Sequence, residues 1–527
     1  MSKVNKKKLS SKPSNAINAE SDVDVFSLKI VIAASAVLCV LATILFDKTK
    51  DLSGIGFAVF GLSMVAAVTV YLAFTKKLTT RNIILLIFAA GFVLRLNYVL
   101  YTPISTRTRQ HDLYKFGGDK GHSAYIEYFY NNGFTLPDFD PRTKAQFYHP
   151  PLHHFLSAVW MRLLTTFGMS YDRAIESLSF LTLFYSMCSL VICERILDKL
   201  KLRGFGKIIP IAIITFHPTF ILFSGSVNND NLANLFTLLS FYAALSWQAE
   251  PTMKNIMLIA FSVGLGMSTK LSVALIAPAI AIVFLYKLIC DRNNLVKYVK
   301  QFVSFACVCL PLGLWFYIRN AVKFGVPMTY VPRLYDTSDQ YIGDRTVYER
   351  LFDFSYHPFK NVFLNRIIKG EGDFFEYNPF VTIIKTSVFG EYTFTKHSSV
   401  MIPFCRILLI LNIILIVISL AATVYCVIRK SNFINKIIKI FIVFYYVLVV
   451  AFYLKFVFQY PHTCSMDYRY ITVTFVIGSI FIGMAAAQIK LDFPKKDNII
   501  NLIRYSIIAI TTLFCVMSAL VYIILGA

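Results

Sequence analysis

The stretch MIPFCRILLILNIILIVISLAATVYCVI, residues 401–428, contains a single charged residue, Arg406. An apolar run of about 18 or more residues with so few charges is typical of a transmembrane helix. The chain has 527 residues, 57% of them hydrophobic and only 15% charged, which is too little charge for the surface of a soluble protein of this length. The sequence therefore predicts an all-α integral membrane protein with about thirteen transmembrane helices. The other predicted spans are 28–46, 55–75, 82–101, 174–193, 208–225, 231–248, 255–269, 271–289, 301–320, 440–458, 470–488 and 504–526.

Basic residues are concentrated in alternate short loops between these spans. The formal net charge is +23. With the N-terminus in the cytosol, alternation places the basic loops on the cytosolic side, as the positive-inside rule requires. The excess charge therefore reflects orientation in the membrane, and we expect no nucleic-acid partner. These basic loops carry Lys76, Lys77 and Arg81; Arg195, Lys199, Lys201, Arg203 and Lys207; Lys287, Arg292, Lys297 and Lys300; Arg429, Lys430, Lys436 and Lys439; and Lys490, Lys495 and Lys496.

The predicted spans and loops divide the chain into five regions. Two segments facing outward are too long to be simple turns, and loops of that length usually carry function. Residues 151–167 in the first are apolar but short, which indicates a helix at the outer interface. Short interfacial helices are also expected around 361–394 in the second. The regions are a disordered cytosolic tail (1–27), a helical hairpin (28–81), a membrane core (82–320) that includes the first outer loop (102–173), a second outer loop (321–400) and C-terminal transmembrane helices (401–527).

The first outer loop contains RTRQHDLYKFGGDKGH, residues 107–122, with two candidate catalytic carboxylates. Asp112 or Asp119 could accept the proton of an attacking hydroxyl as a general base. Solvated or helix-capping roles are the alternatives for either residue. His111 and His122 flank the pair, and these four side chains could hold a divalent metal by residue type alone. Their spacing fits no metal-binding motif, so the sequence predicts no cofactor.

Cations near the predicted outer ends of spans are candidates for binding a phosphate. Lys270 lies in GMSTKLS, Arg319 in WFYIRN and Arg469 in MDYRY. A guanidinium offers a planar fork to phosphate oxygens and an ammonium offers a point charge. Arg95, in the last turns of the third predicted span, is a further candidate, because ionisable residues in a membrane are costly. Each could instead anchor its span at the headgroups. His149 opens HPPL, which could be no more than a helix start with Pro at its first position.

Nucleotide-binding motifs are absent from the sequence. It contains no Walker loop, no dinucleotide-binding glycine pattern after a strand and no CxxC pair. Any chemical reaction must therefore draw its energy from the substrate itself.

Several of these residues resemble the pattern of the protein O-mannosyltransferases. That pattern has an Arg in the first core span, then Asp-Glu-Val-His-Phe-Gly, Tyr-Ile and His-Pro-Pro-Leu. Here the matching elements are Arg95, DLYKFGG (112–118), Tyr125 with Ile126, and HPPL (149–152). The wider group is the multi-span GT-C glycosyltransferases, which includes the bacterial aminoarabinose transferases.

Three further stretches look like recurrent segments of bacterial members of this group. They are HPTFILFSGSVNNDNLANLF (217–236), GLGMSTKLSVALIAP (264–278) and WFYIRNAVKFGVP (315–327). The resemblance covers roughly residues 85–330, and beyond that only DYRY (467–470) is similar. The first two spans precede the usual start of the family core, so they resemble an added N-terminal hairpin.

The resemblance implies an inverting glycosyltransferase that uses a polyprenyl-phosphate-linked sugar, with an outer-loop Asp as general base. Aligning DLYKFGG with the mannosyltransferase pattern assigns that role to Asp112, although Leu113 replaces the family's Glu. The aminoarabinose-transferase pattern favours Asp119 instead. Together with the residue types and the predicted topology, this function makes four residues candidates for substrate binding and four cations candidates for binding the donor phosphate. The former are His111, His122, His149 and Tyr125, and the latter are Lys270, Arg319, Arg469 and Arg95.

The expected partners are thus the lipid-linked donor, membrane lipid, and an acceptor hydroxyl on a protein, a lipid or a cell-wall glycan. The active site is expected on the outer face of a bacterial plasma membrane, or in the endoplasmic reticulum membrane of a eukaryote. The alternative is a transporter or flippase for a lipid-linked glycan, which would share the span count and the outer cations. Transporters usually show paired repeats with interrupted spans, and the sequence shows no clear repeat.

Overall fold

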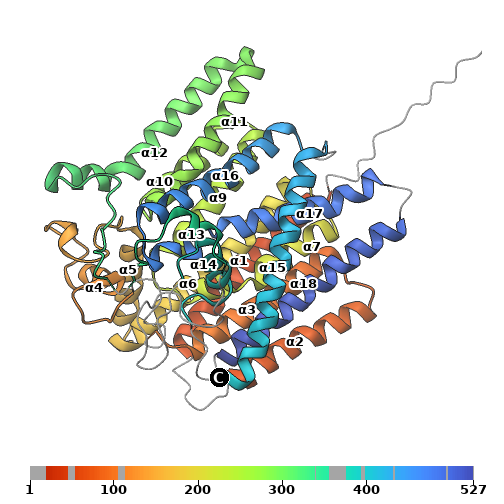
Figure 1. The fold of residues 1–527 in the computed structure, drawn as a ribbon, viewed down its shortest axis with the longest axis horizontal. Coiled ribbons are helices and arrows are strands. Elements are labelled where there is room, and N and C mark those ends of the chain that lie inside the picture. Colours follow the sequence, from red (N-terminus) through yellow and green to blue (C-terminus); the bar gives the residue numbers. More distant parts are fainter. Residues whose placement is uncertain are drawn as a thin grey trace, which may run out of the picture.

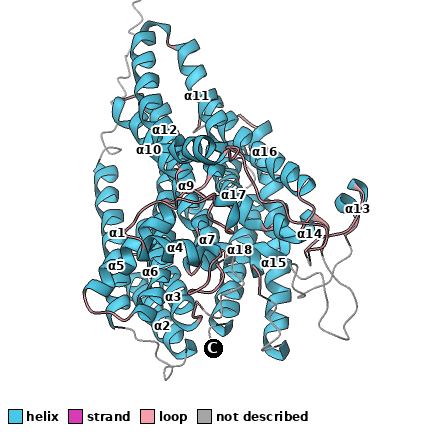
Figure 2. Ribbon diagram, turned by 90° about the vertical axis from the view of Figure 1, so that its left-hand side faces the viewer, coloured by secondary structure: helices cyan, strands magenta, loops and turns pink. Residues whose placement is uncertain are grey.

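A computed structural model describes residues 19–45, 54–104, 113–338, 340–354, 376–392, 398–430, 434–493 and 497–525. Within these ranges the regular secondary structure is helical, and the one β-type pairing is an isolated antiparallel bridge between Tyr341 and His462. The predicted all-α class is therefore confirmed (Figure 2).

The α-helices follow the apolar segments closely. They are α1 (Ala19–Leu45), α2 (Gly54–Phe74), α3 (Thr80–Tyr101), α4 (Gly121–Asn131), α5 (Leu152–Thr166), α6 (Tyr171–Lys199), α7 (Phe205–Phe216), α8 (Pro218–Ser224), α9 (Asn229–Ala249), α10 (Met253–Met267), α11 (Ala277–Cys290), α12 (Leu295–Phe324), α13 (Val347–Phe352), α14 (Pro379–Phe389), α15 (Ser398–Ile428), α16 (Lys436–Gln459), α17 (Val473–Asp492) and α18 (Asp497–Leu525). Short 3₁₀ helices are η2 (Pro141–Thr143), η3 (Leu271–Ile276), η4 (Arg292–Asn294), η6 (Thr463–Met466) and η7 (Tyr468–Ile471).

Nine helices in the described part of the chain are long and apolar enough to cross a membrane. The pair α7 and α8, bent by 52° where Pro218 begins the second helix, could form a tenth span. The predicted spans at 28–46, 231–248 and 255–269 coincide with α1, α9 and α10. The described apolar part of α1, Lys29–Leu45, and the whole of α10 are shorter than 18 residues, and α9 begins with the polar sequence NDNLAN. A multi-pass membrane bundle is supported, and the count of thirteen stays a prediction.

The N-terminal region differs from the predicted boundary. Helix α1 begins at Ala19, ahead of the expected start at residue 28, and residues 1–18 lie outside the described ranges. The sequence AESDVDVFSL at 19–28 contains neither Gly nor Pro, so nothing in it breaks a helix. Helix α1 packs on α6, and α2 packs on α3.

The two predicted outer loops contain short helices, as expected. In the first, α4 and α5 pack on each other and on the start of α6 around a separate apolar core that includes Tyr125, Phe129 and Met161. Figure 1 shows α4 and α5 at the left end of the molecule. In the second, α13 and α14 are the described helices, while residues 355–375 lie outside the described part. The position of α5 at a membrane interface stays a prediction.

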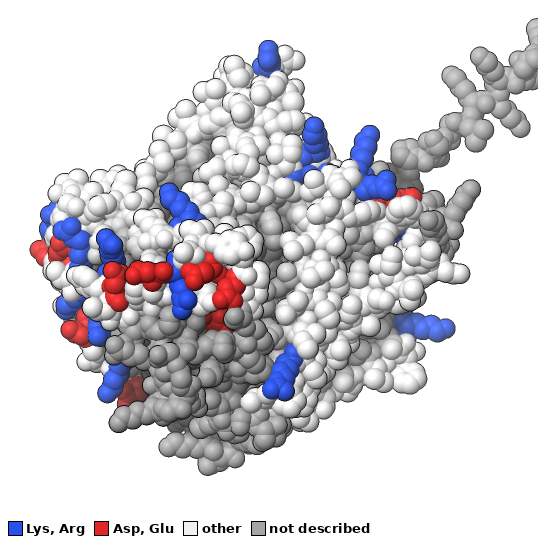
Figure 3. Space-filling model, in the orientation of Figure 1, with Lys and Arg blue, Asp and Glu red and all other residues white. Residues whose placement is uncertain are grey.

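Charged side chains are distributed unevenly over the face shown in Figure 3. Acidic side chains gather towards the left, where they alternate with Lys and Arg, and the charges towards the right are mostly basic. A broad uncharged surface separates the two groups. An uncharged zone between two charged groups suits a membrane-spanning bundle, and the assignment of the two sides to the cytosol and the outer face stays a prediction.

Candidate functional site

Lys270 and Asp230 lie in two segments that pack on each other, the start of η3 and the start of α9. Asn228 caps the start of α9, where its side chain accepts a hydrogen bond from the backbone N–H of Asp230 (3.0 Å). The side-chain amide of Asn229 donates to the carbonyl of Thr269 (3.1 Å), which ties α9 to the segment between α10 and η3. Lys270 is the extended residue just before η3, and its Nζ forms an ion pair with the carboxylate of Asp230.

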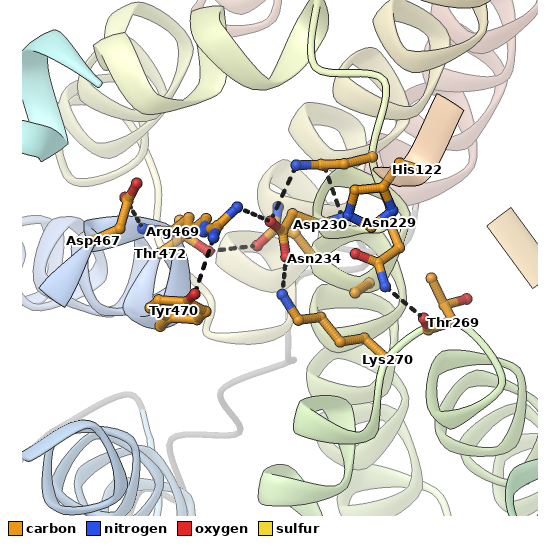
Figure 4. A network of polar contacts seen from close by, with 12 residues as sticks. His122, Asn229, Asp230, Asn234, Thr269, Lys270, Asp467, Arg469, Tyr470 and Thr472 are labelled. Atoms are coloured by element: carbon orange, nitrogen blue, oxygen red, sulfur yellow. Dashed lines mark hydrogen bonds and ion pairs between the residues drawn. The ribbon is translucent and has the colours of Figure 1, made fainter. Parts of the chain in front are cut away.

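Arg469 approaches the same carboxylate from the C-terminal half of the chain. It lies in η7, whose first turn is capped by Asp467 through the backbone N–H of Arg469 (2.8 Å). One guanidinium nitrogen lies 3.8 Å from Oδ2 of Asp230. Figure 4 shows Lys270 and Arg469 pointing toward the carboxylate of Asp230. The side chains of Asp230 and Arg469 are 5% and 7% exposed, so this triad with Lys270 is largely removed from water.

A cavity of about 540 Å³ opens next to the triad. His122, His149, Asn229 and Ser272 add to its polar end, together with the three charged residues. Its remaining walls are mainly apolar and aromatic, with contributions from η3, α11 and α16. These walls include Leu275, Pro278, Val449, Phe452, Tyr453 and Phe456. The cavity therefore has a charged end and an apolar end, and it is large enough for a small ligand.

Histidines from the first outer loop form a stacked group beside the cavity. Nδ1 of His122 and Nε2 of His154 are 2.8 Å apart, so one ring donates to the other. The His149 ring stacks on His122 with centroids 5.5 Å apart. Burial lowers the pKa of His122, His149 and His154 well below 6.5, so these rings are neutral at pH 7. Neutral rings can accept or donate hydrogen bonds. The charge at the cavity therefore comes from Asp230, Lys270 and Arg469.

Acidification is expected to destabilise the fold through His153, a fully buried residue of α5 whose ring meets that of His154 edge to face, with centroids 5.5 Å apart. Burial lowers the pKa of His153 from 6.5 to about 4. Between about pH 6.5 and pH 4, His153 is therefore protonated in the unfolded chain and neutral in the folded chain. Stability is complete above pH 6.5 and falls as the pH drops towards 4, by about 3 kcal/mol for His153 alone. Thermal unfolding in detergent between pH 7.5 and pH 4.5 measures this loss. His153→Gln should flatten the pH profile, and a variant profile parallel to the wild type would contradict the assignment.

Two other predicted binding residues, Tyr125 and Arg319, do not line this cavity. Tyr125 is fully buried between Phe147 and His154, with ring centroids 4.5 and 4.3 Å away, so it supports the histidine group and does not line the cavity. Arg319 donates to the carbonyl of Pro137 and to Asn320. It fastens α12 to the first outer loop and lies outside the cavity lining, although Tyr317 of the same helix lines it.

Arg95 is completely buried within the helix bundle. Its Nε donates to Oγ of Ser186 (3.1 Å) and its Nη1 donates to the carbonyl of Gly91 (3.0 Å). Anchoring at the headgroups, the alternative offered by the sequence, does not fit a side chain with 0% exposure. Arg95 is not among the residues that line the cavity, so the structure does not bring it to the triad.

The glycine-rich stretch forms a tight loop against α4. Gly121 has φ +93°, and a Cβ there would lie 2.6 Å from the carbonyl oxygen of Leu113. The N–H of Gly117 donates to the carboxylate of Glu127 (2.7 Å). Asp119 is exposed and lines a separate hollow of about 280 Å³, not the cavity beside Lys270. His111 and Asp112 lie outside the described residues.

The main residue that the sequence analysis missed is Asp230. It is the one carboxylate among the described residues that line the cavity. Its signal was the run NNDN at 228–231, immediately after an apolar segment and before a second one. The described part of the chain contains no group of three His, Cys, Asp or Glu side chains arranged to hold a metal ion.

Two comparisons with known proteins found no similar protein. A scan against models of known protein families matches none of them, and a search of curated proteins finds no significant match.

Proposed function

We propose that the protein is a membrane glycosyltransferase of the GT-C type that transfers a sugar from a polyprenyl-phosphate-linked donor to an acceptor hydroxyl. The observation that carries this proposal is the cavity of about 540 Å³, in which the triad of Asp230, Lys270 and Arg469 adjoins an apolar wall. The sequence resemblance to the protein O-mannosyltransferases and the wider GT-C group supports the same function.

The charge of the triad suits the donor's phosphate. Lys270 and Arg469 carry one positive charge each and Asp230 carries one negative charge, so the triad has a net charge of +1. A phosphodiester between a sugar and a polyprenyl chain carries one negative charge at pH 7, which would make the site neutral. When the sugar leaves, the phosphate gains a second negative charge, and the preorganised cations stabilise that charge as it develops.

The apolar wall suits the polyprenyl chain. Helices α11 and α16 pack on each other next to the cavity. Helix α16 is long and apolar enough to span a membrane, and so is the segment Leu271–Cys290, which joins η3 to α11. Phe452 of α16 lines the cavity and is 47% exposed, so this side of the cavity reaches the lateral surface of the bundle. A lipid chain could leave the cavity along this edge without crossing polar protein surface.

For the acceptor side we propose Asp112 as general base and keep Asp119 as the alternative. The acceptor oxygen attacks the anomeric carbon while the carboxylate takes the hydroxyl proton, and the bond from the anomeric carbon to the phosphate oxygen breaks. The configuration at the anomeric carbon is inverted, and polyprenyl phosphate is the leaving group. The mechanism needs no metal or other cofactor.

The wider setting belongs to the proposal as well. It places about thirteen spans in a plasma membrane or the endoplasmic reticulum, with the cavity on the outer face. It also includes a protein, lipid or cell-wall glycan as acceptor.

Purified protein incubated with a panel of polyprenyl-phosphate sugars tests the proposal. We expect at least one donor to lose its sugar to an added acceptor or, more slowly, to water, detected by mass spectrometry of the lipid product. Failure with every donor, combined with movement of labelled lipid across vesicles, would favour the transporter.

The two aspartates can be separated in the same assay. Asp112→Asn should lower transfer on the order of 100- to 10,000-fold, because the variant cannot accept the proton. Asp119→Asn is the matched control, and it should change the rate little because Asp119 is exposed and outside the cavity. The opposite result would move the base to Asp119, and two active variants would exclude both.

A further inference from the structure

A second, larger cavity lies where α15 ends and α16 begins. It has a volume of about 810 Å³, and its polar rim carries Arg429, Lys430, Lys436 and Lys439. No acidic side chain is among the described residues that line it. Below the rim the walls are apolar, with Val443 and Val447 of α16 among them. It lies away from α4 and α5 (Figure 1), on the side that the positive-inside rule assigns to the cytosol.

The rim is held in place by the ends of the two helices. Nζ of Lys439 donates to the carbonyls of Cys426 (2.7 Å) and Arg429 (2.6 Å), which closes the C-terminal end of α15. The guanidinium of Arg429 lies 5.7 Å from the ring centroid of Phe493. The cations are therefore presented by a defined backbone, next to the first turn of α16.

The combination of a four-cation rim with apolar walls defines the chemistry of an occupant. Lys436 lies at the positive end of the α16 dipole, which disfavours a cation there unless an anion is bound nearby. A soluble anion would satisfy the rim and leave the apolar walls unused. A neutral lipid would fill the walls and leave the positive charge of the rim without a counter-charge.

We propose that this cavity binds an anionic phospholipid of the cytosolic leaflet. Its phosphate lies between Arg429, Lys430 and Lys436, and an acyl chain lies along Val443 and Val447. Basic pockets between transmembrane helices on the cytosolic side are suited to anionic headgroups. This lipid site is separate from the triad of Asp230, Lys270 and Arg469, and it does not depend on the proposed transferase activity.

The cations, and not the apolar walls, should determine which lipid is bound. Any acyl chain can fill an apolar wall, whereas each cation near a membrane surface favours an anionic headgroup by about fivefold. Removing three cations should therefore weaken the preference for an anionic lipid by roughly 100-fold.

The test uses the full chain in mixed micelles of phosphatidylcholine and phosphatidylglycerol, with bound lipids counted by native mass spectrometry. The variant carries Arg429→Gln, Lys430→Gln and Lys436→Gln, and Lys439 is left intact because it closes α15. The matched control carries Arg292→Gln, Lys297→Gln and Lys300→Gln. These exposed residues are also predicted to be cytosolic, and they lie outside the cavity.

We expect the variant to lose its preference for phosphatidylglycerol and the control to keep it. Equal retention by wild type and variant, or equal loss in variant and control, would overturn the proposal. Displacement of phosphatidylglycerol by inorganic phosphate alone would also overturn it, because the occupant would then be a soluble anion.

Cross-linking of the wild-type chain provides a readout that does not depend on folding of the variant. A phosphatidylglycerol with a photoreactive acyl chain should label peptides within 427–447. Labelling confined to other helices would refute the site.

Discussion

Lys270→Gln is expected to lower sugar transfer on the order of 100- to 1,000-fold, mainly through kcat. The charge on the leaving phosphate is greater in the transition state than in the bound donor, so the lost cation matters most when the glycosidic bond breaks. Arg469 still faces Asp230 at 3.8 Å in this variant, so the triad keeps one ion pair. Initial rates with the best donor of the panel measure the effect.

Lys323→Gln is the matched control for this variant. Lys323 lies on α12, forms an ion pair with Asp138 and is 45% exposed, and it is not part of the cavity lining. Its loss should leave kcat and KM nearly unchanged. If Lys270→Gln showed wild-type kinetics, the donor phosphate would not bind beside Lys270, and the proposed phosphate site would be wrong.

Asp230→Asn is expected to destabilise the protein by about 3–5 kcal/mol, because it leaves two largely buried cations without their shared carboxylate. The side chain of Lys270 is only 16% exposed and that of Arg469 only 7%, so water cannot compensate fully. Thermal unfolding of the purified protein should reveal this loss as a lower Tm. Asp138→Asn, which breaks an ion pair with 77% and 45% exposed side chains, should cost only about 0–1 kcal/mol.

An added anion should rescue Asp230→Asn if the triad is a phosphate site. With Asp230 neutralised, the two cations attract an anion more strongly than they do in the wild type. Pyrophosphate at about 100 times its Kd for Asp230→Asn should raise the unfolding free energy of that variant by roughly 2.7 kcal/mol. The wild type is measured at the same concentration. It should raise the Tm of Asp230→Asn more than that of the wild type. An equal rise in both, or none, would mean that the triad is a structural ion-pair network.

Much of the fold could be predicted because its signals are local. A helix satisfies its own backbone hydrogen bonds, so an apolar segment of sufficient length predicts a transmembrane helix without any knowledge of its neighbours. The segment at 401–428 became α15 with the predicted C-terminal limit at Ile428. The sequence was less informative for α9, where polar residues interrupt the first turn, and for α1, whose start lies ahead of the predicted boundary.

The site could be predicted only in part. Residue type and predicted topology were enough to select Lys270, Arg469, His122 and His149, which line one cavity. The same reasoning also selected Arg319 and Arg95, because a cation that fastens a loop and one that binds a phosphate look alike in a sequence. Arg319 instead donates to the carbonyl of Pro137, and Arg95 donates to Ser186 inside the bundle.

The sequence by itself determined the helical membrane class, the approximate limits of most spans and the asymmetry of basic residues, since each depends on the local balance of apolar and charged side chains. Only the tertiary structure decided which polar groups meet. Asp230 and Lys270 are 40 residues apart in the chain, and Arg469 comes from beyond α16. Nothing local identifies Asp230 as their partner, because the low-dielectric environment that strengthens this triad exists only after α9, η3 and η7 have packed together.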